Sequence, residues 1–147
     1  MTNHAHITET PRPATRVRAI LCTGTGSLVL IKRVRPGRDP YWVAPGGEIE
    51  TGDRDPQAAL VRELHEELGA TIEIERPAFR LVEDSSQQLF YVCRLLALNL
   101  AQRHGPELSD PARGAYIPTE IPLTRTAILR TNIQPPALHN YLLVMCG

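Results

Sequence analysis

Short runs of hydrophobic residues separated by polar ones dominate the first third of the chain, and this pattern predicts strands. Valine, isoleucine and leucine are concentrated in 17–22 and in 28–34, and the Gly24-Thr25-Gly26-Ser27 segment between these runs is typical of a hairpin turn. A third, shorter strand is expected at 41–43, immediately before Pro45-Gly46-Gly47. The first third of the chain is therefore predicted to form part of a sheet.

The clearest helix is expected from about Pro56 to Leu68. Asp55 is a good N-cap, Pro56 suits the first helical position, and Gly69 supplies the C-terminal stop. One arc of this helix is apolar and is expected to face the core. Its members are Leu60, Val61, Leu64 and Leu68.

The second half of the chain has a weaker pattern. The expected elements are strands at 72–81 and 89–98, a loop through 105–114, a strand at 116–123 and a helix at 137–145. Pro118 and Pro122 make the strand at 116–123 an edge strand or a broken one. The order of elements predicts a mixed α/β fold.

The first fourteen residues, 1–14, are polar and lack an apolar period, so we expect a flexible arm there. Residues 15–147 are expected to form one domain, because a chain of 147 residues is long enough to bury a single core.

Charge and cysteine content narrow the function classes. The chain has 16 basic and 16 acidic residues, which argues against a dominant attraction to nucleic acid or to an anionic membrane. Its longest apolar run, 142–145, is too short to span a bilayer, and 1–13 lacks the apolar segment of a secretory signal. The cysteines, Cys22, Cys93 and Cys146, show no Cys-x-x-Cys spacing. Reduced thiols in a cytoplasmic protein are therefore expected.

The candidate chemistry lies on the helix at 56–68. Glu63, Glu66 and Glu67 fall within an arc of about 100°. They repel one another, and only Arg62 is placed locally to relieve them. Such a stripe by itself is more typical of a solvated helix face. The preceding Pro45-Gly46-Gly47 changes the picture, because glycine lets a backbone carbonyl approach a ligand and Mg²⁺ takes carboxylate, carbonyl and phosphate oxygens. Together these parts predict a diphosphate-binding metal site.

The segment from Gly46 to Gly69, GGEIETGDRDPQAALVRELHEELG, resembles the Nudix box, G-x5-E-x7-R-E-U-x-E-E-x-G-U, where U is a bulky aliphatic residue. The matching residues are Gly47, Arg62, Glu63, Leu64, Glu66, Glu67 and Gly69, with Ala70 at the final aliphatic position. On these residues the chain is similar to the Nudix hydrolase family, also described as MutT-like.

The resemblance implies an α/β/α sandwich around a mixed β-sheet and an Mg²⁺-dependent pyrophosphohydrolase, with Mn²⁺ as an alternative ion. The implied reaction is hydrolysis of a phosphoanhydride bond in a nucleoside diphosphate linked to another moiety. By resemblance, the Gly46 carbonyl, Glu63, Glu66 and Glu67 are the metal ligands.

The resemblance also implies roles in catalysis. Arg62 and Glu66 are candidate catalytic residues, but family members differ over the general base. It is a glutamate of the box in some and one from a later loop in others. Glu107 is our loop candidate, and Glu120 is the second choice.

Two departures from the box concern Arg62. The spacing from Gly47 to Arg62 is one residue longer than the pattern, and the usual loop glutamate is missing. In the family that glutamate braces the box arginine. Asp53 is the nearest substitute, so the sequence leaves open how Arg62 is held.

Several alternatives remain open at this point. A nucleoside triphosphate pyrophosphatase of the sanitising type is the rival enzyme, and a non-catalytic nucleotide-binding sensor is the rival from another class. The expected partner is a small nucleotide substrate; membrane and nucleic-acid partners are not expected, and a homodimer is one assembly that the resemblance allows. Trp42 is expected to pack against the helix at 56–68 rather than to stack on a base.

Overall fold

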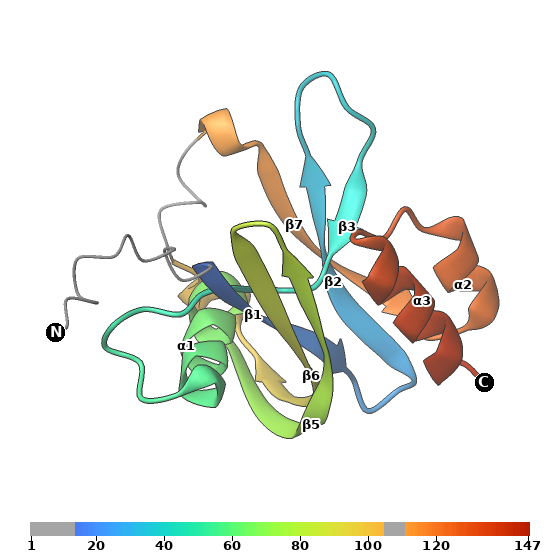
Figure 1. Cartoon of the computed structure of the whole chain (residues 1–147). Coiled ribbons are helices and arrows are strands. Elements are labelled where there is room, and N and C mark those ends of the chain that lie inside the picture. Colours follow the sequence, from blue (N-terminus) through green and yellow to red (C-terminus); the bar gives the residue numbers. More distant parts are fainter. Residues whose placement is uncertain (1–13, 105–110) are drawn as a thin grey trace, which may run out of the picture.

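The computed structural model describes residues 14–104 and 111–147 as a single mixed sheet with helices on both faces (Figure 1). The strands are β1 (Ala14–Cys22), β2 (Ser27–Val34), β3 (Tyr41–Val43), β4 (Gly46–Glu48), β5 (Ala70–Glu83), β6 (Ser86–Leu98) and β7 (Ala115–Pro122). The helices are α1 (Pro56–Leu68), α2 (Arg125–Arg130) and α3 (Pro136–Met145), with short 3-10 turns η2 (Leu100–Gln102) and η4 (Pro111–Arg113).

The sheet has the strand order β3-β2-β1-β6-β5, with β4 beside β1 and β7 beside β2. β1 and β6 run parallel, whereas the other neighbouring strands run antiparallel. Strand β7 pairs with β2 along its whole length, from Val34↔Ala115 to Ser27↔Pro122. Within the described residues β7 has no other neighbour, so its prolines lie on an edge strand, as predicted.

Strand β4 was not predicted from the sequence. A triplet containing two glycines has little intrinsic strand preference, but it pairs antiparallel with β1 in the register Arg18↔Gly46 and Val17↔Gly47. The pairing fixes the glycine pair beside the central strand of the sheet.

Helix α1 begins and ends where the sequence predicts. The Asp55 carboxylate accepts a hydrogen bond from the Ala58 N–H, and Gly69 ends the helix at φ 63°. Its apolar side packs on one face of the sheet in a first core cluster. That cluster includes Val17, Ala19, Leu21, Ala59, Leu60, Leu64 and Leu68.

The expectation that Val61 faces the core was wrong, because Val61 is 48% exposed. The buried arc of α1 is rotated toward Ala59, Glu63 and Glu67, all of which are buried. Two of the three box glutamates therefore lie between the helix and the sheet rather than on a solvated face.

Helices α2 and α3 cover the opposite face and build a second core cluster with Ile20, Leu30, Phe90, Ile128 and Leu142. The sequence did not predict α2, because a helix of six residues is too short to leave a periodic signal. Thr124 is the N-cap of this helix. The three layers confirm the predicted α/β/α sandwich.

The expectation for Trp42 was also wrong, since its side chain packs against the second cluster and not against α1. The reason lies in the backbone of β3. The Trp42 N–H donates to the Asn132 carbonyl and the Trp42 carbonyl accepts from the Gln134 N–H, so β3 is tied to the segment before α3.

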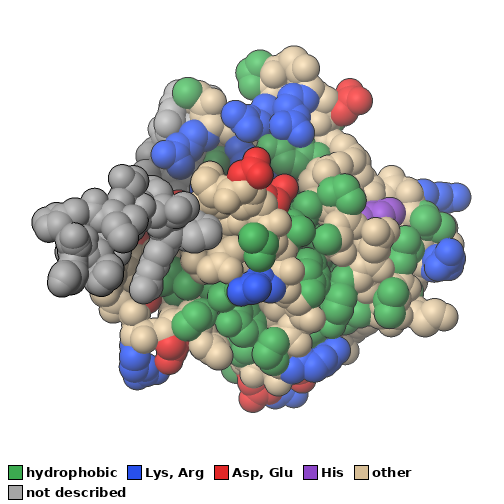
Figure 2. Space-filling model, in the orientation of Figure 1, with side chains coloured by type: hydrophobic (Ala, Val, Ile, Leu, Met, Phe, Trp, Pro, Cys, Tyr) green, Lys and Arg blue, Asp and Glu red, His purple; other side chains and the backbone are tan. Residues whose placement is uncertain are grey.

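Most of the expected arm, 1–14, lies outside the described residues; its last residue, Ala14, begins β1. No helix in the described part of the chain has the length and apolar character needed to cross a membrane. The three cysteines are free thiols. Figure 2 shows Lys and Arg side chains gathered over the upper end of the molecule, next to acidic ones, while hydrophobic side chains are spread over the front.

Candidate active site

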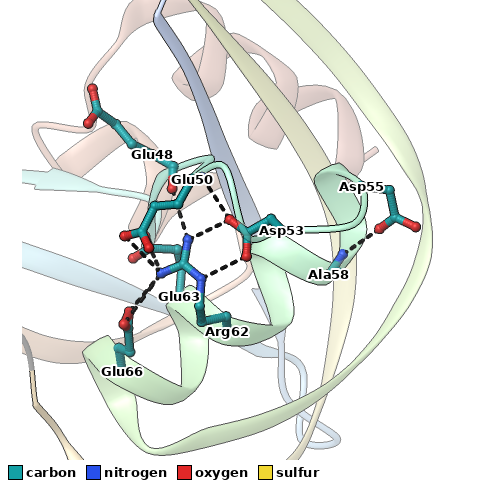
Figure 3. A network of polar contacts seen from close by, with 8 residues as sticks. All are labelled: Glu48, Glu50, Asp53, Asp55, Ala58, Arg62, Glu63 and Glu66. Carbon is teal, nitrogen blue, oxygen red and sulfur yellow. Dashed lines mark hydrogen bonds and ion pairs between the residues drawn. The ribbon is translucent and has the colours of Figure 1, made fainter.

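Arg62 lies at the centre of a group of acidic side chains, and each of its guanidinium nitrogens is bonded within the chain (Figure 3). Nε and Nη2 donate to the two oxygens of Asp53 at 2.9 and 2.8 Å. Nη1 donates to Glu66 Oε2 at 2.9 Å and to Glu63 Oε1 at 3.1 Å. Nη2 also reaches the Glu48 carbonyl at 3.1 Å. The guanidinium therefore holds two box glutamates in fixed positions.

Asp53 braces Arg62 in the place where the box pattern has a glutamate. Its contact with the guanidinium is bidentate, the geometry in which Arg–carboxylate pairs are strongest. The bond from Arg62, followed by the bond from the Glu50 N–H, lowers the pKa of the Asp53 carboxyl to about 2. The hydrogen bond with Asp53 also raises the pKa of Arg62. Asp53 thus holds the arginine, which the sequence had left open.

Glu67 faces the glycine pair. Its Oε1 accepts a hydrogen bond of 2.8 Å from the Gly46 N–H, and the residue is only 5% exposed. Glu63 is 8% exposed and lies against Gly47, where an added Cβ would collide with its carboxylate. The need for glycine at position 47 is therefore steric, since any side chain there would displace a box glutamate.

The C-terminal end of α1 is held by the segment around η2, which the sequence did not reveal. Arg103 Nε donates to the Glu67 carbonyl at 2.7 Å, and the His104 N–H donates to the Glu66 carbonyl at 2.7 Å. Arg103 Nη2 also donates to the Tyr116 carbonyl of β7 at 2.9 Å. These bonds satisfy carbonyls that a helix end leaves open and fix the turn that carries Glu66 and Glu67.

Arg18 is the second cation near the acids, and sequence analysis missed it. It stands on β1 opposite Gly46, and its charge interacts with Glu67 and Glu63. Burial lowers the pKa of its guanidinium, and the nearby glutamates oppose that effect. Because a guanidinium keeps its proton under all ordinary conditions, Arg18 adds one fixed positive charge behind the site.

Acidic groups outnumber basic ones here among the described residues. The carboxylates of Asp53, Glu63 and Glu66 pair with the Arg62 guanidinium, and the charges of Glu63 and Glu67 also interact with Arg18. Burying an uncompensated charge is costly, and hard oxygen donors of this kind are what Mg²⁺ prefers. The donor set thus fits a divalent cation, although within 14–104 and 111–147 no three acidic, His or Cys side chains already surround a common point.

The remaining candidates are less well placed. Glu107 lies outside the described residues. Glu120 stands on β7 opposite Val29, and its carboxylate accepts a 2.6 Å hydrogen bond from Ser27 Oγ beside the β1–β2 turn. It has a structural partner there, so the geometry does not favour it as the general base.

A family profile for the NUDIX domain matches residues 12–115. The chain belongs to the Nudix family. A curated relative, the RNA pyrophosphohydrolase of Acidiphilium cryptum, is 42% identical over 57 residues, which are 37% of this chain and 34% of the relative. The match thus spans about a third of that relative's length.

Solved structures of Nudix proteins share the fold. A NUDIX hydrolase from Nitrosomonas europaea superimposes with a TM-score of 0.68 at 14% identity, covering 89% of this chain and 86% of its own. A MutT structure from a study of Aliivibrio salmonicida and Vibrio cholerae has a TM-score of 0.63 at 21% identity, and the match covers 91% of this chain and 99% of that one. A UDP-X diphosphatase has a TM-score of 0.63 at 20% identity, and the match covers 96% of this chain and 66% of that one. At these identities the likeness concerns the Nudix fold.

Proposed function

We propose that this Nudix protein is an Mg²⁺-dependent pyrophosphohydrolase that cleaves the phosphoanhydride of a nucleoside diphosphate linked to another moiety. The observation that carries the proposal is the arrangement around Arg62. One guanidinium holds Glu63 and Glu66 through the same nitrogen while Asp53 locks its other side. A merely solvated acidic face would not bury two of its glutamates against a glycine pair.

In this proposal Glu63, Glu66 and Glu67 hold the metal together with the Gly46 carbonyl. The Gly46 N–H already fixes the Glu67 carboxylate beside that residue. When bound, the ion supplies neutralisation of the diphosphate and a more acidic water. Mn²⁺ has similar ligand preferences and is expected to substitute.

The chain's own groups position the acids and handle the proton. A water oxygen forms a new bond to one phosphorus, the bridging P–O bond breaks, and the two products are phosphate monoesters. Glu66 is our candidate to accept the proton of that water, because its carboxylate is the most exposed of the three box glutamates. Arg62 orients Glu66, and Glu107 is the alternative base.

A panel assay tests the proposal. Purified protein is incubated with nucleotide sugars, ADP-ribose, dinucleoside polyphosphates, nucleoside triphosphates and 5′-triphosphorylated RNA, in Mg²⁺, in Mn²⁺ and in excess chelator. We expect turnover of at least one diphosphate-linked substrate, giving a nucleoside monophosphate and a phosphorylated second product, and no turnover in chelator.

The rival functions give different products. Release of pyrophosphate from triphosphates alone would identify a sanitising triphosphatase, and the Acidiphilium cryptum relative makes 5′-triphosphorylated RNA a relevant substrate to include. Nucleotide binding with no turnover on the whole panel would identify a sensor and contradict the proposal.

A further inference from the structure

Two histidines lie together at the C-terminal end of α1. His65 stands on the last turn of that helix, and His104 comes shortly after η2. Their ring centroids are 5.9 Å apart, and the ring planes meet at 68°. Both residues are exposed. Aromatic rings often pack edge to face in this way, so the ring nitrogens decide whether the pair can also bind a ligand.

The tautomer of His104 follows from its hydrogen-bond partner. His104 Nδ1 lies 3.0 Å from the Gln102 carbonyl, and a carbonyl oxygen can only accept. Nδ1 must therefore carry the proton, so in the neutral ring the lone pair of Nε2 has no partner among the described residues. Metal-binding histidines have this arrangement, in which one ring N–H donates to a backbone carbonyl and the other nitrogen binds the ion. His104 is thus held in the tautomer that binds a metal through Nε2.

The His65 ring is available as the second ligand. Its nitrogens have no hydrogen-bond partner anywhere in the described part of the chain, so either one can supply a lone pair. The backbones of the two histidines are fixed to the same turn. The Gly69 N–H donates to the His65 carbonyl at 2.8 Å, and the His104 N–H donates to the Glu66 carbonyl at 2.7 Å. The two rings are therefore held close together by backbone hydrogen bonds.

The separation of the rings fits one shared ion. Zn²⁺ binds an imidazole nitrogen at about 2.0–2.1 Å, so two imidazoles on one tetrahedral ion have ring centroids roughly 5 Å apart. Wider angles at the metal increase this separation to roughly 6 Å. The observed 5.9 Å lies within that range. Because exposed side chains change rotamer within nanoseconds, the His65 ring can turn a nitrogen toward the ion without any movement of the backbone.

The histidine pair selects a different kind of ion from the acid site, which is formed by the carboxylates of Asp53, Glu63, Glu66 and Glu67. Imidazole nitrogens suit Zn²⁺, Cu²⁺ and Ni²⁺, whereas Mg²⁺ takes oxygen ligands. Among the residues that the structure describes, no third acidic, histidine or cysteine side chain completes a metal site with the pair. Water fills the remaining positions of such an ion, so the site would be open and its ion exchangeable.

We propose that His65 and His104 bind one divalent transition-metal ion such as Zn²⁺, separately from the acid site, and that this ion clamps the C-terminal turn of α1 to the segment 99–104. The two ligands come from different elements, so the ion adds a link to the backbone hydrogen bonds that already join them. The clamped turn carries Glu66 and Glu67, and the ion therefore stabilises the part of the helix that holds these acids. The inference does not depend on whether the protein hydrolyses a nucleotide.

The test follows each histidine ring separately. The full chain, labelled with ¹⁵N, is kept in saturating Mg²⁺ while Zn²⁺ is added and two-bond ¹H–¹⁵N spectra of the imidazoles are recorded. Zn²⁺ at the carboxylates gives no imidazole signal, and the five histidines of the chain are observed one by one. We expect His104 to have a protonated Nδ1 before Zn²⁺ is added. One nitrogen of His65 and one of His104 should then shift together, with a single midpoint.

Two variants, His65→Gln and His104→Gln, each remove one ligand and keep a polar side chain. The midpoint of the shift in the remaining histidine should move to a Zn²⁺ concentration at least about tenfold higher, which is the lower limit for losing even a group that only orients a metal ligand. His139→Gln is the matched control, because His139 lies on α3 with its Nε2 2.8 Å from the Ile128 carbonyl. Its midpoint should equal the parent's. Melting curves without Zn²⁺ verify that each variant is folded.

The clamp predicts a second readout at the backbone. Because the His104 N–H is bonded to the Glu66 carbonyl, its hydrogen exchange with solvent reports the opening of this turn. At a free Zn²⁺ concentration of about ten times the Kd, that exchange should slow about tenfold in the parent, since the turn can open only after the ion is released. At the same concentration it should slow much less in His65→Gln.

Each outcome decides the proposal. A His104 ring protonated at Nε2 instead of Nδ1, a shift in only one of the two rings, no shift in either, or equal midpoints in the parent and His65→Gln would overturn the site. A joint shift with unchanged exchange of the His104 N–H would overturn the clamp. Because no hydrolysis is measured, these results are independent of the substrate panel.

Discussion

On the α1 face of the sheet, each guanidinium nitrogen of Arg62 is bonded to another group of the chain, whereas on the α3 face the Gln88 nitrogen and the Gln134 oxygen have no partner in the described residues. The acid site is saturated with internal hydrogen bonds and carries excess negative charge. The α3 face has a cavity lined by Arg18, Gln88 and Gln134, in which Arg18 is the charged residue and the two amides keep a donor and an acceptor open. The first region thus holds its charged side chains in fixed positions, whereas the second leaves polar atoms without partners among the described residues.

The two regions also differ in how they are assembled. The acid site comes from residues 46–67, and it is formed by one strand, one loop and one helix that follow each other in the chain. The cavity joins Arg18, Gln88 and Gln134, which lie on β1, on β6 and just before α3. Separate assembly makes it feasible to disable one region and leave the other intact.

The largest effect is expected for Glu67→Gln. This change keeps an oxygen to accept from the Gly46 N–H but removes a charge from the acid site. Turnover should fall at least about a hundredfold, as when one preorganised charge-stabilising group is lost. Rate assays on the purified variant and the parent measure this loss.

Stability supplies a second criterion for the same variant. In chelator Glu67→Gln should be as stable as the parent or slightly more stable, because fewer like charges repel one another. In Mg²⁺ the melting temperature of the parent should rise more than that of the variant, because the ion binds the folded parent by mass action. Glu73→Gln is the control, because Glu73 is half-exposed and pairs with Arg94 on the far strands. Equal Mg²⁺ shifts in the parent and both variants would contradict the assignment.

A smaller loss is expected for Gly47→Ala. The new methyl group would collide with the Glu63 carboxylate and move it away from Arg62. A displacement of about 1 Å in a catalytic group can cost about a hundredfold, so we expect turnover between tenfold and a hundredfold below the parent. Gly52→Ala is the control, because nothing lies within 4 Å of the position of its added Cβ. Similar rates in the two variants would mean that the position of Glu63 does not matter.

The smallest effect is expected for Asp53→Asn, which keeps one acceptor for Arg62 and loses the charged, bidentate contact. Turnover should fall about tenfold, at the lower end for groups that orient metal ligands. The effect on stability depends on pH. The folded-state pKa of Asp53 is about 2, below the ordinary 3.8, so the pair stabilises the fold above about pH 4 and is lost as pH falls toward 2.

Melting temperatures of the parent and Asp53→Asn across pH 2–6 measure that dependence. The gap between the two proteins should be constant above about pH 4 and should shrink between pH 4 and 2, because the parent's carboxylate becomes protonated there. A gap that does not change over this interval would show that Asp53 does not brace Arg62 as a carboxylate.

The local parts of the molecule could be predicted from the sequence. Asp55, Pro56 and Gly69 are capping signals that act within a few residues, so both ends of α1 were correct. The spacing of Glu63, Glu66 and Glu67 placed them on neighbouring positions of α1, because helix geometry alone decides it. The family and the sandwich fold followed from the box and are confirmed. The ligand roles of the box acids remain a prediction.

The parts that failed depend on partners distant in the chain. Val61 was assigned to the core because its position on the helix is apolar, but the sheet packs against the arc that contains Glu63 and Glu67. Strand β4 exists because β1 pairs with it, and Trp42 was misplaced because Asn132 and Gln134 tie β3 to the other face. Arg18 left no sequence signal, because its contacts are with residues far along the chain.

The parallel pairing of β1 with β6 has a consequence for synthesis of the protein. Ala14 is opposite Ser86, so the first strand leaves the ribosome 72 residues before its parallel neighbour. At about 5–20 residues per second, this is a delay of roughly 4–14 s. During that time β2 and β4 can shield only one side of β1, and the other side is an unpaired edge of Val17, Ile20 and Leu21. Translational pauses within β5, which lengthen this interval, should therefore increase the share of nascent chains that need a chaperone.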